Sequence, residues 1–234
     1  MHHNEIEGVT AIDKLNFYYK KYGKTMTNKD KIIQVAMTMF KNNGYNKTSI
    51  RDIVAASGIS TGQFYKHFSD KDALLKEVHL REHLTELSQI NTYVKTYHEP
   101  LLTFALNMDV IINKVQTYEV YAESIINQKS DFLLSNDFLT AIDEVNRISF
   151  QNYIQDMTDN DLRNYNILIQ GMLKNVIMTY LKGYDSDIED KRDLLIKSAF
   201  KIYDVPGKKI EALMALLKEI RLNPEYITLM AQTF

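Results

Sequence analysis

The chain has no cysteine, only three prolines and only eight glycines among its 234 residues. Without cysteine it can form no disulfide bridge and offers no thiolate to a metal or to redox chemistry. The scarcity of proline and glycine favours helices joined by short loops over a turn-rich β fold. No stretch alternates apolar and polar residues as a half-buried strand does, and the sequence holds no internal repeat or low-complexity run. We therefore expect an all-α fold.

Features that define several other protein classes are also missing. No window holds the roughly 20 apolar residues that a membrane span needs, since Gln170, Lys174 and Asn175 interrupt the most apolar segment. The opening residues MHHNEIEGVT lack the basic start and apolar run of a signal peptide. The phosphate loop GxxxxGK followed by serine or threonine does not occur. We expect a cytoplasmic protein that is not an enzyme, has no cofactor or bound metal, and stays out of membranes.

Charge is nearly balanced over the chain, at a formal net charge of −2, but it is unevenly distributed. From Lys24 to Lys76 there are nine lysines and arginines against four acidic residues, whereas the part from Glu77 onwards carries 16 basic and 23 acidic residues. A basic segment ahead of an acidic body is typical of a protein whose first part meets a polyanion.

Apolar residues recur at helical spacing in the first third of the chain. One helix stripe, with Asn28 as the expected N-cap and Gly44 as the expected stop, comprises Ile32, Val35, Ala36, Met39 and Phe40. Three more helices are expected over 48–57, 60–67 and from 69 to about 94. Their expected N-caps are Thr48, Ser60 and Ser69.

The two short helices, separated by the turn at Gly58, make a helix-turn-helix. Phe64 and Phe68, four residues apart, are expected to pack the second helix onto the first. The side chains left on its outer face donate and accept hydrogen bonds, as base edges and phosphates in a major groove require. They are Thr61, Gln63, Tyr65, Lys66 and His67.

Two further residues are expected to bind phosphates. Lys71 lies in the first turn of the next helix, where its ammonium and free backbone amides can act together. Thr48 can offer its hydroxyl and nearby amides. Gln63 has capping-box spacing to Ser60, which makes its side chain less free to contact a base.

The stretch TSIRDIVAASGISTGQFYKHFSDKDALL resembles the DNA-binding signature of the TetR family of transcriptional regulators. The resemblance covers about Lys29 to Lys76 and includes the Y-x-x-F pair and the lysine two residues after Ser69. It implies an all-helical homodimer whose first three helices bind double-stranded operator DNA and whose larger C-terminal body binds a small-molecule effector. We expect an N-terminal extension over 1–27 that resembles a basic arm, a DNA-binding domain over 28–75, and a regulatory and dimerisation domain over 76–234.

The body is expected to be helical throughout, with helices near 118–129, 137–156, 160–182, 188–203 and 207–221 and a short piece after Pro224. Candidate ligand-binding residues, which core packing explains as well, are Phe104, Met108, Tyr118, Tyr121 and Phe150, with Arg147 as a partner for an anion. The helix over 160–182 is apolar on most sides, which favours a twofold interface but also fits a helix buried in a monomer. The candidate interface residues are Tyr165, Ile169, Met172, Val176, Tyr180, Leu195, Ala199 and Ile202.

His79, Glu82 and His83 match H-x-x-E-H, a pattern of some zinc peptidases. Two histidines one helical turn apart can supply two metal ligands. A solvated helix face is the simpler interpretation, and a metal or haem sensor is an alternative.

Together these features favour a ligand-responsive transcriptional repressor that acts as a homodimer on a palindromic operator, with half-sites about one helical turn apart. One alternative is an activator or a chromosome or division factor of the same fold. Another is a helical metalloenzyme that uses His79, Glu82 and His83.

Overall fold

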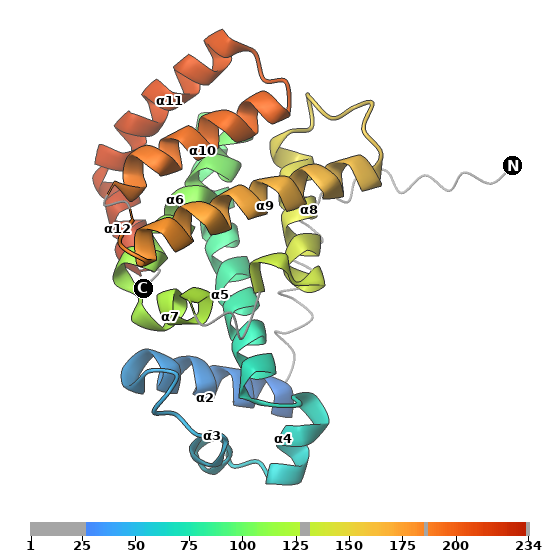
Figure 1. Ribbon diagram of the computed structural model, residues 1–234, viewed down its shortest axis with the longest axis vertical. Helices are drawn as coiled ribbons and strands as arrows, with labels where there is room; N and C mark the ends of the chain where they lie inside the picture. Colours follow the sequence, from blue (N-terminus) through green and yellow to red (C-terminus); the bar gives the residue numbers. More distant parts are fainter. Residues whose placement is uncertain (1–26, 127–131, 185–186, 233–234) are drawn as a thin grey trace, which may run out of the picture.

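The computed structural model describes residues 27–126, 132–184 and 187–232, and across these ranges it contains helices, turns and loops but no strand. Figure 1 shows a small head, made of α2, α3 and α4, joined by α5 to a larger body. The helices of the head and the connecting helix are α2 (Asn28–Asn43), α3 (Ile50–Ser57), α4 (Thr61–His67) and α5 (Lys71–Val94). The helices of the body are η1 (Lys95–Tyr97), α6 (Leu101–Thr117), α7 (Glu119–Ile126), η2 (Phe132–Leu134), α8 (Asn136–Ser149), α9 (Asp159–Leu181), α10 (Ile188–Ile202), α11 (Gly207–Leu222) and α12 (Pro224–Gln232).

This architecture confirms the all-α prediction of a small N-terminal helix-turn-helix unit ahead of a larger helical body. The expected basic arm over 1–27 lies, apart from its last residue, outside the described residues.

Side chains that accept the first-turn amides set the helix starts in the head. Three capping boxes pair Thr27 with Asp30, Ser49 with Asp52, and Ser60 with Gln63. The predicted cap at Ser60 is confirmed, whereas the caps predicted at Asn28 and Thr48 are wrong by one residue. The aspartate at the third helical position fixes the cap in both cases, because its carboxylate must reach back to the cap's own amide. The cap of α5 is Asp70, which accepts from the Ala73 amide, and not Ser69.

A buried aromatic pair holds α4 in place. Phe64 is fully buried and Phe68 is 5% exposed, with their ring centroids 5.8 Å apart. Both belong to one buried cluster with Ile53 of α3 and Phe40 of α2. Gly58 turns the chain between α3 and α4 with φ 68° and ψ 25°, a left-handed conformation that glycine adopts without strain. The angle between α3 and α4 is therefore fixed by packing beneath and a glycine at the turn.

The head is held to the rest of the molecule from two sides. Arg81 of α5 pairs with Asp30 of α2 at 2.7 Å, and other charged residues of the two helices lie close by. Val120 of α7 belongs to the same buried cluster as the apolar residues of the head. Figure 1 shows α7 directly above α2. A change at α5 or α7 can therefore reach the head through packed contacts.

Helix α6 lies at the centre of the body, and its residues 101–112 are all buried. The buried carboxylate of Asp109 accepts hydrogen bonds from Arg221 of α11 at 2.9 and 2.7 Å and lies 3.2 Å from Arg192 of α10. Paired in this way, a buried charge is tolerated and joins three helices.

Within the described residues, the helix bounds in the body follow the prediction with one exception. The helix expected over 137–156 ends at Ser149, where the chain turns and buries Phe150 and Ile154 in the core. The helix expected near 118–129 is described up to Ile126, and the residues that follow lie outside the described ranges. Among the described helices, none has both the length and the apolarity that a membrane crossing requires.

Candidate functional site

The outer face of α4 carries five exposed polar side chains, here called the α4 rim: Thr61, Gln63, Tyr65, Lys66 and His67. Tyr65 is 55% exposed although its ring touches the buried Phe64 edge-on, with centroids 5.3 Å apart. The rim thus stands on a rigid apolar base and faces away from the chain, as expected from the sequence.

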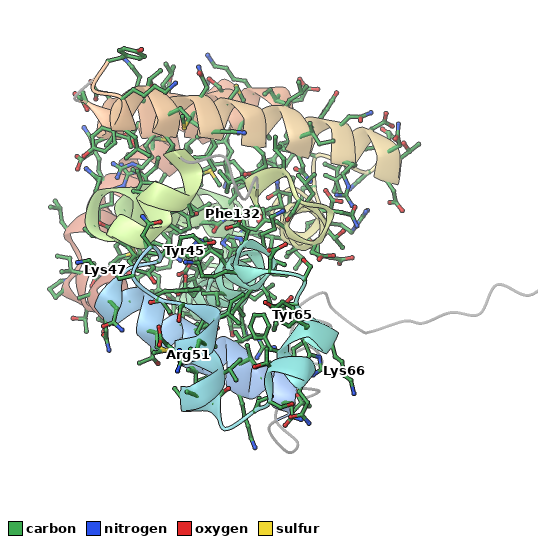
Figure 2. All side chains as sticks on the ribbon, turned by 60° about the horizontal axis from the view of Figure 1, so that its bottom comes forward. Tyr45, Lys47, Arg51, Tyr65, Lys66 and Phe132 are labelled. Carbon is green, nitrogen blue, oxygen red and sulfur yellow. The ribbon has the colours of Figure 1, made fainter. Side chains whose placement is uncertain are left out.

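Two basic side chains that the sequence did not single out lie on other segments of the head. Lys47 is in the loop between α2 and α3, and Arg51 is in the first turn of α3; both are exposed. In Figure 2 these two residues and Lys66 lie on the side of the head that is turned toward the viewer. Three cations from three different segments therefore give this side of the head a surface suited to a phosphate backbone. The excess of basic residues between 24 and 76 was the only sequence signal for them.

The structure corrects the predicted phosphate contacts of Thr48 and Lys71. Thr48 is 2% exposed and donates its hydroxyl to the carbonyl of Gly44 at 2.8 Å. The ammonium of Lys71 donates to the carbonyls of Tyr45 and Thr48 at 2.9 and 3.0 Å and lies 4.1 Å from the centre of the Tyr45 ring. The Tyr45 hydroxyl donates to Asp72. These contacts fasten the loop between α2 and α3 to the start of α5, so Thr48 and Lys71 hold the head together.

Gln63 uses part of its side chain for the helix cap. Its carbonyl oxygen accepts the Ser60 amide at 3.3 Å, and the Ser60 hydroxyl accepts the Gln63 amide at 3.2 Å. The segment Gly58 to Gly62 also has the GxSxG spacing of hydrolase nucleophiles, but such a serine follows a strand. Ser60 instead joins two helices as an N-cap, so the spacing carries no catalytic role here.

The predicted ligand-binding residues separate into two places. Phe104 and Phe150 pack on each other at 5.2 Å between centroids and, like Met108, lie inside the apolar core of the body. Arg147 is exposed and pairs with Asp159 at 2.8 Å, so the predicted inward partner for an anion is wrong. Tyr118 and Tyr121 instead lie at a buried group of charged residues, with the Lys114 ammonium 6.0 and 4.6 Å from their ring centres.

That group, here called the α5–α6 polar cluster, consists of His79, Glu82, His83, Glu86, Lys114 and Tyr118. His79 and His83 are 1% and 2% exposed, so the expectation of a solvated helix face is wrong. Lys114 lies between Glu82 at 3.1 Å and Glu86 at 2.8 Å. Within the described ranges no three histidine, aspartate or glutamate side chains are placed to hold a metal ion.

Burial and charge set the protonation of the cluster. Burial lowers the pKa of His79 and brings the pKa of His83 to about 3, so both imidazoles are neutral at pH 7. Burial raises the pKa of Glu86, and Lys114 offsets this only in part. Burial also acts to raise the pKa of Glu82, but Lys114 and His79 outweigh it and hold the pKa at about 2. The two carboxylates raise the pKa of Lys114 against the effect of its burial.

We expect the free energy of unfolding to fall as the pH drops below about 6.5, because the unfolded chain protonates histidines that the folded chain keeps neutral. His83→Leu removes one of these groups and should make the fall between pH 6.5 and 5 shallower by up to about 1.4 kcal/mol per pH unit. Glu86, with its raised pKa, acts with the opposite sign above pH 4.5, so the difference between variant and wild type is the informative quantity. Urea unfolding at pH 7, 6 and 5 measures it. Identical pH dependence of the two proteins would contradict the burial of a neutral His83.

The predicted dimer residues turn largely toward their own protomer. Ile169, Leu195 and Ala199 are at most 3% exposed, so the prediction is wrong for them. The others, half-buried against the same core, are Tyr165, Met172, Val176, Tyr180 and Ile202. The apolar side chains left exposed on these two helices are Ile167 and Leu168 on α9 and Leu194 on α10. A helix turns by 100° per residue, so the positions next to a buried stripe face elsewhere.

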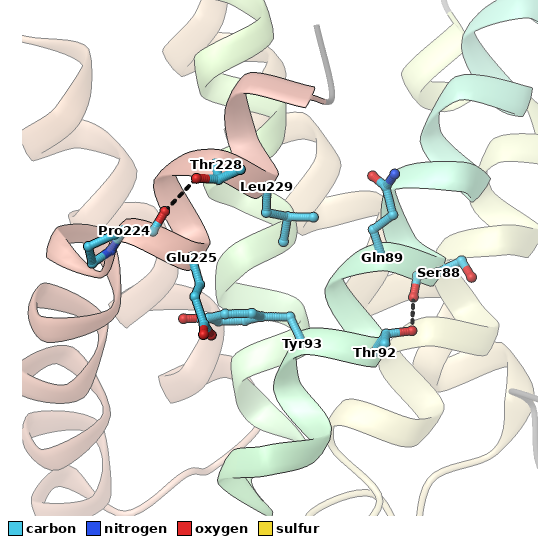
Figure 3. Close-up of a pocket in the computed structure, with 8 residues that line it drawn as sticks. All are labelled: Ser88, Gln89, Thr92, Tyr93, Pro224, Glu225, Thr228 and Leu229. Atoms are coloured by element: carbon cyan, nitrogen blue, oxygen red, sulfur yellow. Dashed lines mark hydrogen bonds between the residues drawn. The ribbon is translucent and has the colours of Figure 1, made fainter.

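A groove of about 640 Å³ runs between α5 and α12. Figure 3 shows that Thr92 and Thr228, which line it, donate their hydroxyls to carbonyls of their own helices. None of the predicted ligand-binding residues lines this groove.

Comparison with known proteins places the head in a family. The model of bacterial regulatory proteins of the tetR family matches residues 32–78. The transcriptional repressor KstR2 of Mycolicibacterium smegmatis is 41% identical over 56 residues, which are 24% of this chain and 27% of KstR2. The transcriptional regulator QacR of Staphylococcus aureus is 45% identical over 53 residues, which are 23% of this chain and 28% of QacR. The matches thus span about a quarter of the length of these curated relatives.

Solved structures extend the likeness to the body. RolR without ligand matches with a TM-score of 0.58 and 16% identity over 75% of this chain and 95% of RolR. RolR in complex with resorcinol matches with a TM-score of 0.56 and 16% identity over 82% of this chain and 93% of RolR. At this identity the likeness shows a shared fold.

An outward-facing polar helix in a helix-turn-helix, joined by a long helix to an all-helical body, is the architecture of a helix-turn-helix protein. The family model that matches residues 32–78 identifies this kind of helix-turn-helix more narrowly, and RolR shares the fold of the whole. The segment over 32–78 is therefore a DNA-binding domain of the tetR family of bacterial regulatory proteins, which confirms the resemblance seen in the sequence.

Proposed function

We propose that this protein is a ligand-responsive transcriptional repressor that binds a palindromic operator as a homodimer. The observation that carries the proposal is the α4 rim, which presents polar side chains outward on a helix fixed by two buried phenyl rings. Each protomer places α4 in a major groove, where Tyr65, Lys66 and His67 meet base edges and phosphates. Lys47 and Arg51 bind the flanking backbone and add affinity without sequence preference.

Dimerisation is supported by the exposed apolar side chains of α9 and α10. Leu168 is 60% exposed and Leu194 is 59% exposed, and Ile167 lies beside Leu168. Solvent-exposed leucines on two helices that pack on each other are typical of an interaction surface. We propose that α9 and α10 of two protomers form a four-helix interface around a twofold axis. Such an interface fixes the spacing of the two heads.

Ligand response is supported by the fold and by the α5–α6 polar cluster. RolR, which shares this fold, has been solved with resorcinol bound. We propose that the body of this protein also binds a small organic effector, and that α5 transmits the binding to the head. The effector shifts the protein between two arrangements of the heads only by its difference in affinity for them.

The DNA contacts can be tested with two rim variants. Lys66→Ala should weaken binding to a random-sequence duplex about tenfold and lower the slope of log affinity against log salt by about one. Tyr65→Ala should weaken binding about tenfold to the operator that wild type selects from a pool of random duplexes. Fluorescence anisotropy at several salt concentrations measures both effects.

Lys218→Ala is the matched control, because this lysine is exposed on α11 in the body. It should leave affinity and salt dependence unchanged. If the rim variants bind DNA like this control while their heads remain folded, the proposed docking of α4 is wrong.

A further inference from the structure

The groove between α5 and α12 lies on the same face of α5 as the start of α2. Arg81, Ser88 and Thr92 are seven and four residues apart, so they follow one face of α5, and the last two line the groove. Arg81 pairs with Asp30 of α2 at 2.7 Å, and Thr27 donates its hydroxyl to the same carboxylate at 2.6 Å. The chain that precedes Thr27 therefore joins the head beside the face of α5 that leads to the groove.

Several side chains that line the groove have their polar atoms engaged within the chain. Thr92 and Thr228 donate their hydroxyls to carbonyls of their own helices, as Figure 3 shows. The Tyr93 hydroxyl lies 3.0 Å from the hydroxyl of Tyr97. These residues leave methyl groups and a ring to the groove, beside the side chain of Leu229. Walls of this kind suit an apolar surface better than a ligand that depends on hydrogen bonds.

The segment before α2 has an apolar surface of that kind in its sequence. Val9, Ile12, Leu15, Tyr19 and Tyr22 are three or four residues apart, which is the spacing of one face of a helix. Residues 1–26 lie outside the described part of the chain. An amphipathic helix that lays such a stripe into a groove between other helices is a recurring mode of recognition.

The length of chain between this stripe and the head matches the distance to the groove. Ser88 lies seven residues beyond Arg81, which is about 10 Å along α5 at the rise of an α-helix. Residues 23–26 span at most about 14 Å when extended. Tyr22 can therefore reach the near end of the groove. A segment tethered so close to the groove also has a high effective concentration there, which a separate molecule lacks.

Charge favours the same occupant. Residues 9–24 hold four lysines and one aspartate, whereas the chain from Glu77 onwards holds 16 basic and 23 acidic residues. The exposed Glu225 of α12 lines the groove itself. Lysines on either side of the apolar stripe are attracted to such a surface, and like charges do not oppose the approach.

We propose that residues 9–22 bind in the groove between α5 and α12 of their own chain, with the apolar stripe against Tyr93 and Leu229. Bound there, the segment ties the start of the head to the far end of α5 and to the last helix of the body. Only its basic end, with Lys20, Lys21 and Lys24, stays close to the head. The greater part of the segment is then not an arm on DNA.

The test is cysteine cross-linking in the full chain, which has no cysteine of its own. Asn16→Cys, beside the stripe, is combined with Thr92→Cys at the groove or with Gln34→Cys on α2 as the control. Gln34 is exposed and lies seven residues from Thr27, so an unbound segment reaches it at least as readily as it reaches the groove. A short bismaleimide should join the groove pair at least about tenfold faster than the control pair. Peptide mass spectrometry of the monomer band from a denaturing gel measures both rates.

Two neighbouring substitutions show whether the apolar stripe is responsible. Leu15→Glu places a carboxylate on the stripe, where binding would bury it, and should lower the cross-linking rate of the groove pair to that of the control pair. Lys14→Glu introduces the same side chain one position earlier, on another face of the helix. It should leave the groove pair cross-linking at least about fivefold faster than the control pair.

Equal rates for the two cysteine pairs overturn the inference, and so does a rate that Leu15→Glu leaves unchanged. Cross-links that join two chains on the gel also overturn it, because the segment of a second copy then occupies the groove. The measurement contains no DNA, so its failure leaves the proposed repressor function standing. Failure of the rim variants to weaken DNA binding would reject the docking of α4 and leave the groove assignment intact.

Discussion

Replacing Phe64 with alanine is expected to unfold the head and abolish DNA binding while the body stays folded. Phe64 is fully buried at the centre of the head, with the Phe68 ring 5.8 Å away. Removal of a buried phenyl ring costs about 3–5 kcal/mol. A three-helix head has only part of the roughly 5–15 kcal/mol by which whole domains are stable. Circular dichroism should show an early thermal transition with a small amplitude, and affinity for any DNA duplex should fall at least about 100-fold.

The neighbouring residue supplies the control. Tyr65→Ala removes a ring of similar size from the same helix, but that ring is 55% exposed. It should change the free energy of unfolding by no more than about 0.5 kcal/mol, as surface substitutions usually do. Only the affinity for DNA should change. Similar destabilisation by both substitutions would show that Phe64 is not the anchor of the rim.

Introducing glutamate at Leu168 is expected to break the homodimer and with it operator binding. Leu168 is 60% exposed on α9, and at a twofold interface its side chain lies near its own symmetry mate or the exposed Leu194 of α10. A buried, unpaired carboxylate at that place is strongly disfavoured. In a monomer, each head binds its half-site independently. The second head then no longer has the high effective concentration that a dimer gives it once the first head is bound, so operator affinity should fall by about 100-fold or more. Analytical ultracentrifugation gives the mass, and anisotropy gives the affinity.

Leu222→Glu is the matched control for the dimer prediction. Leu222 is 79% exposed at the end of α11, a helix outside the proposed α9–α10 interface. This variant should remain a dimer and bind the operator like wild type. If Leu168→Glu also stays a dimer, a different surface joins the protomers. If it becomes a monomer and still binds the operator fully, the heads do not act as a linked pair.

The parts of the site that the sequence predicted correctly depend on contacts close in the chain. The cap of Ser60 on Gln63 spans three residues, and the anchoring pair Phe64 and Phe68 spans four. Side chains at those separations meet on any helix, so the spacing alone indicates both the helix and its outward face. The caps at Asn28 and Thr48 were off by one residue because several polar residues stood near each helix start.

Residues with distant partners were predicted less well. Lys71 looked like a phosphate ligand, but its ammonium donates to the carbonyls of Tyr45 and Thr48, which lie 26 and 23 residues away. The spacing of His79 and His83 indicates a solvated helix face or a pair of metal ligands. In the structure, the packing of α6 and η2 against α5 buries both side chains. Nothing local in the sequence indicates that Lys114, 28 residues beyond Glu86, is its ion-pair partner.

The sequence by itself determined the helical class, the family of the DNA-binding segment over 32–78, and the outward polar rim of α4, because helix periodicity and capping act over three or four residues. Tertiary structure decided which side chains are buried, which lysines and arginines have ion-pair or hydrogen-bond partners within the chain, and which side of α9 is exposed to solvent. Burial and ion pairing depend on segments that meet only after the chain has packed, and no pattern of spacing within one helix specifies those neighbours.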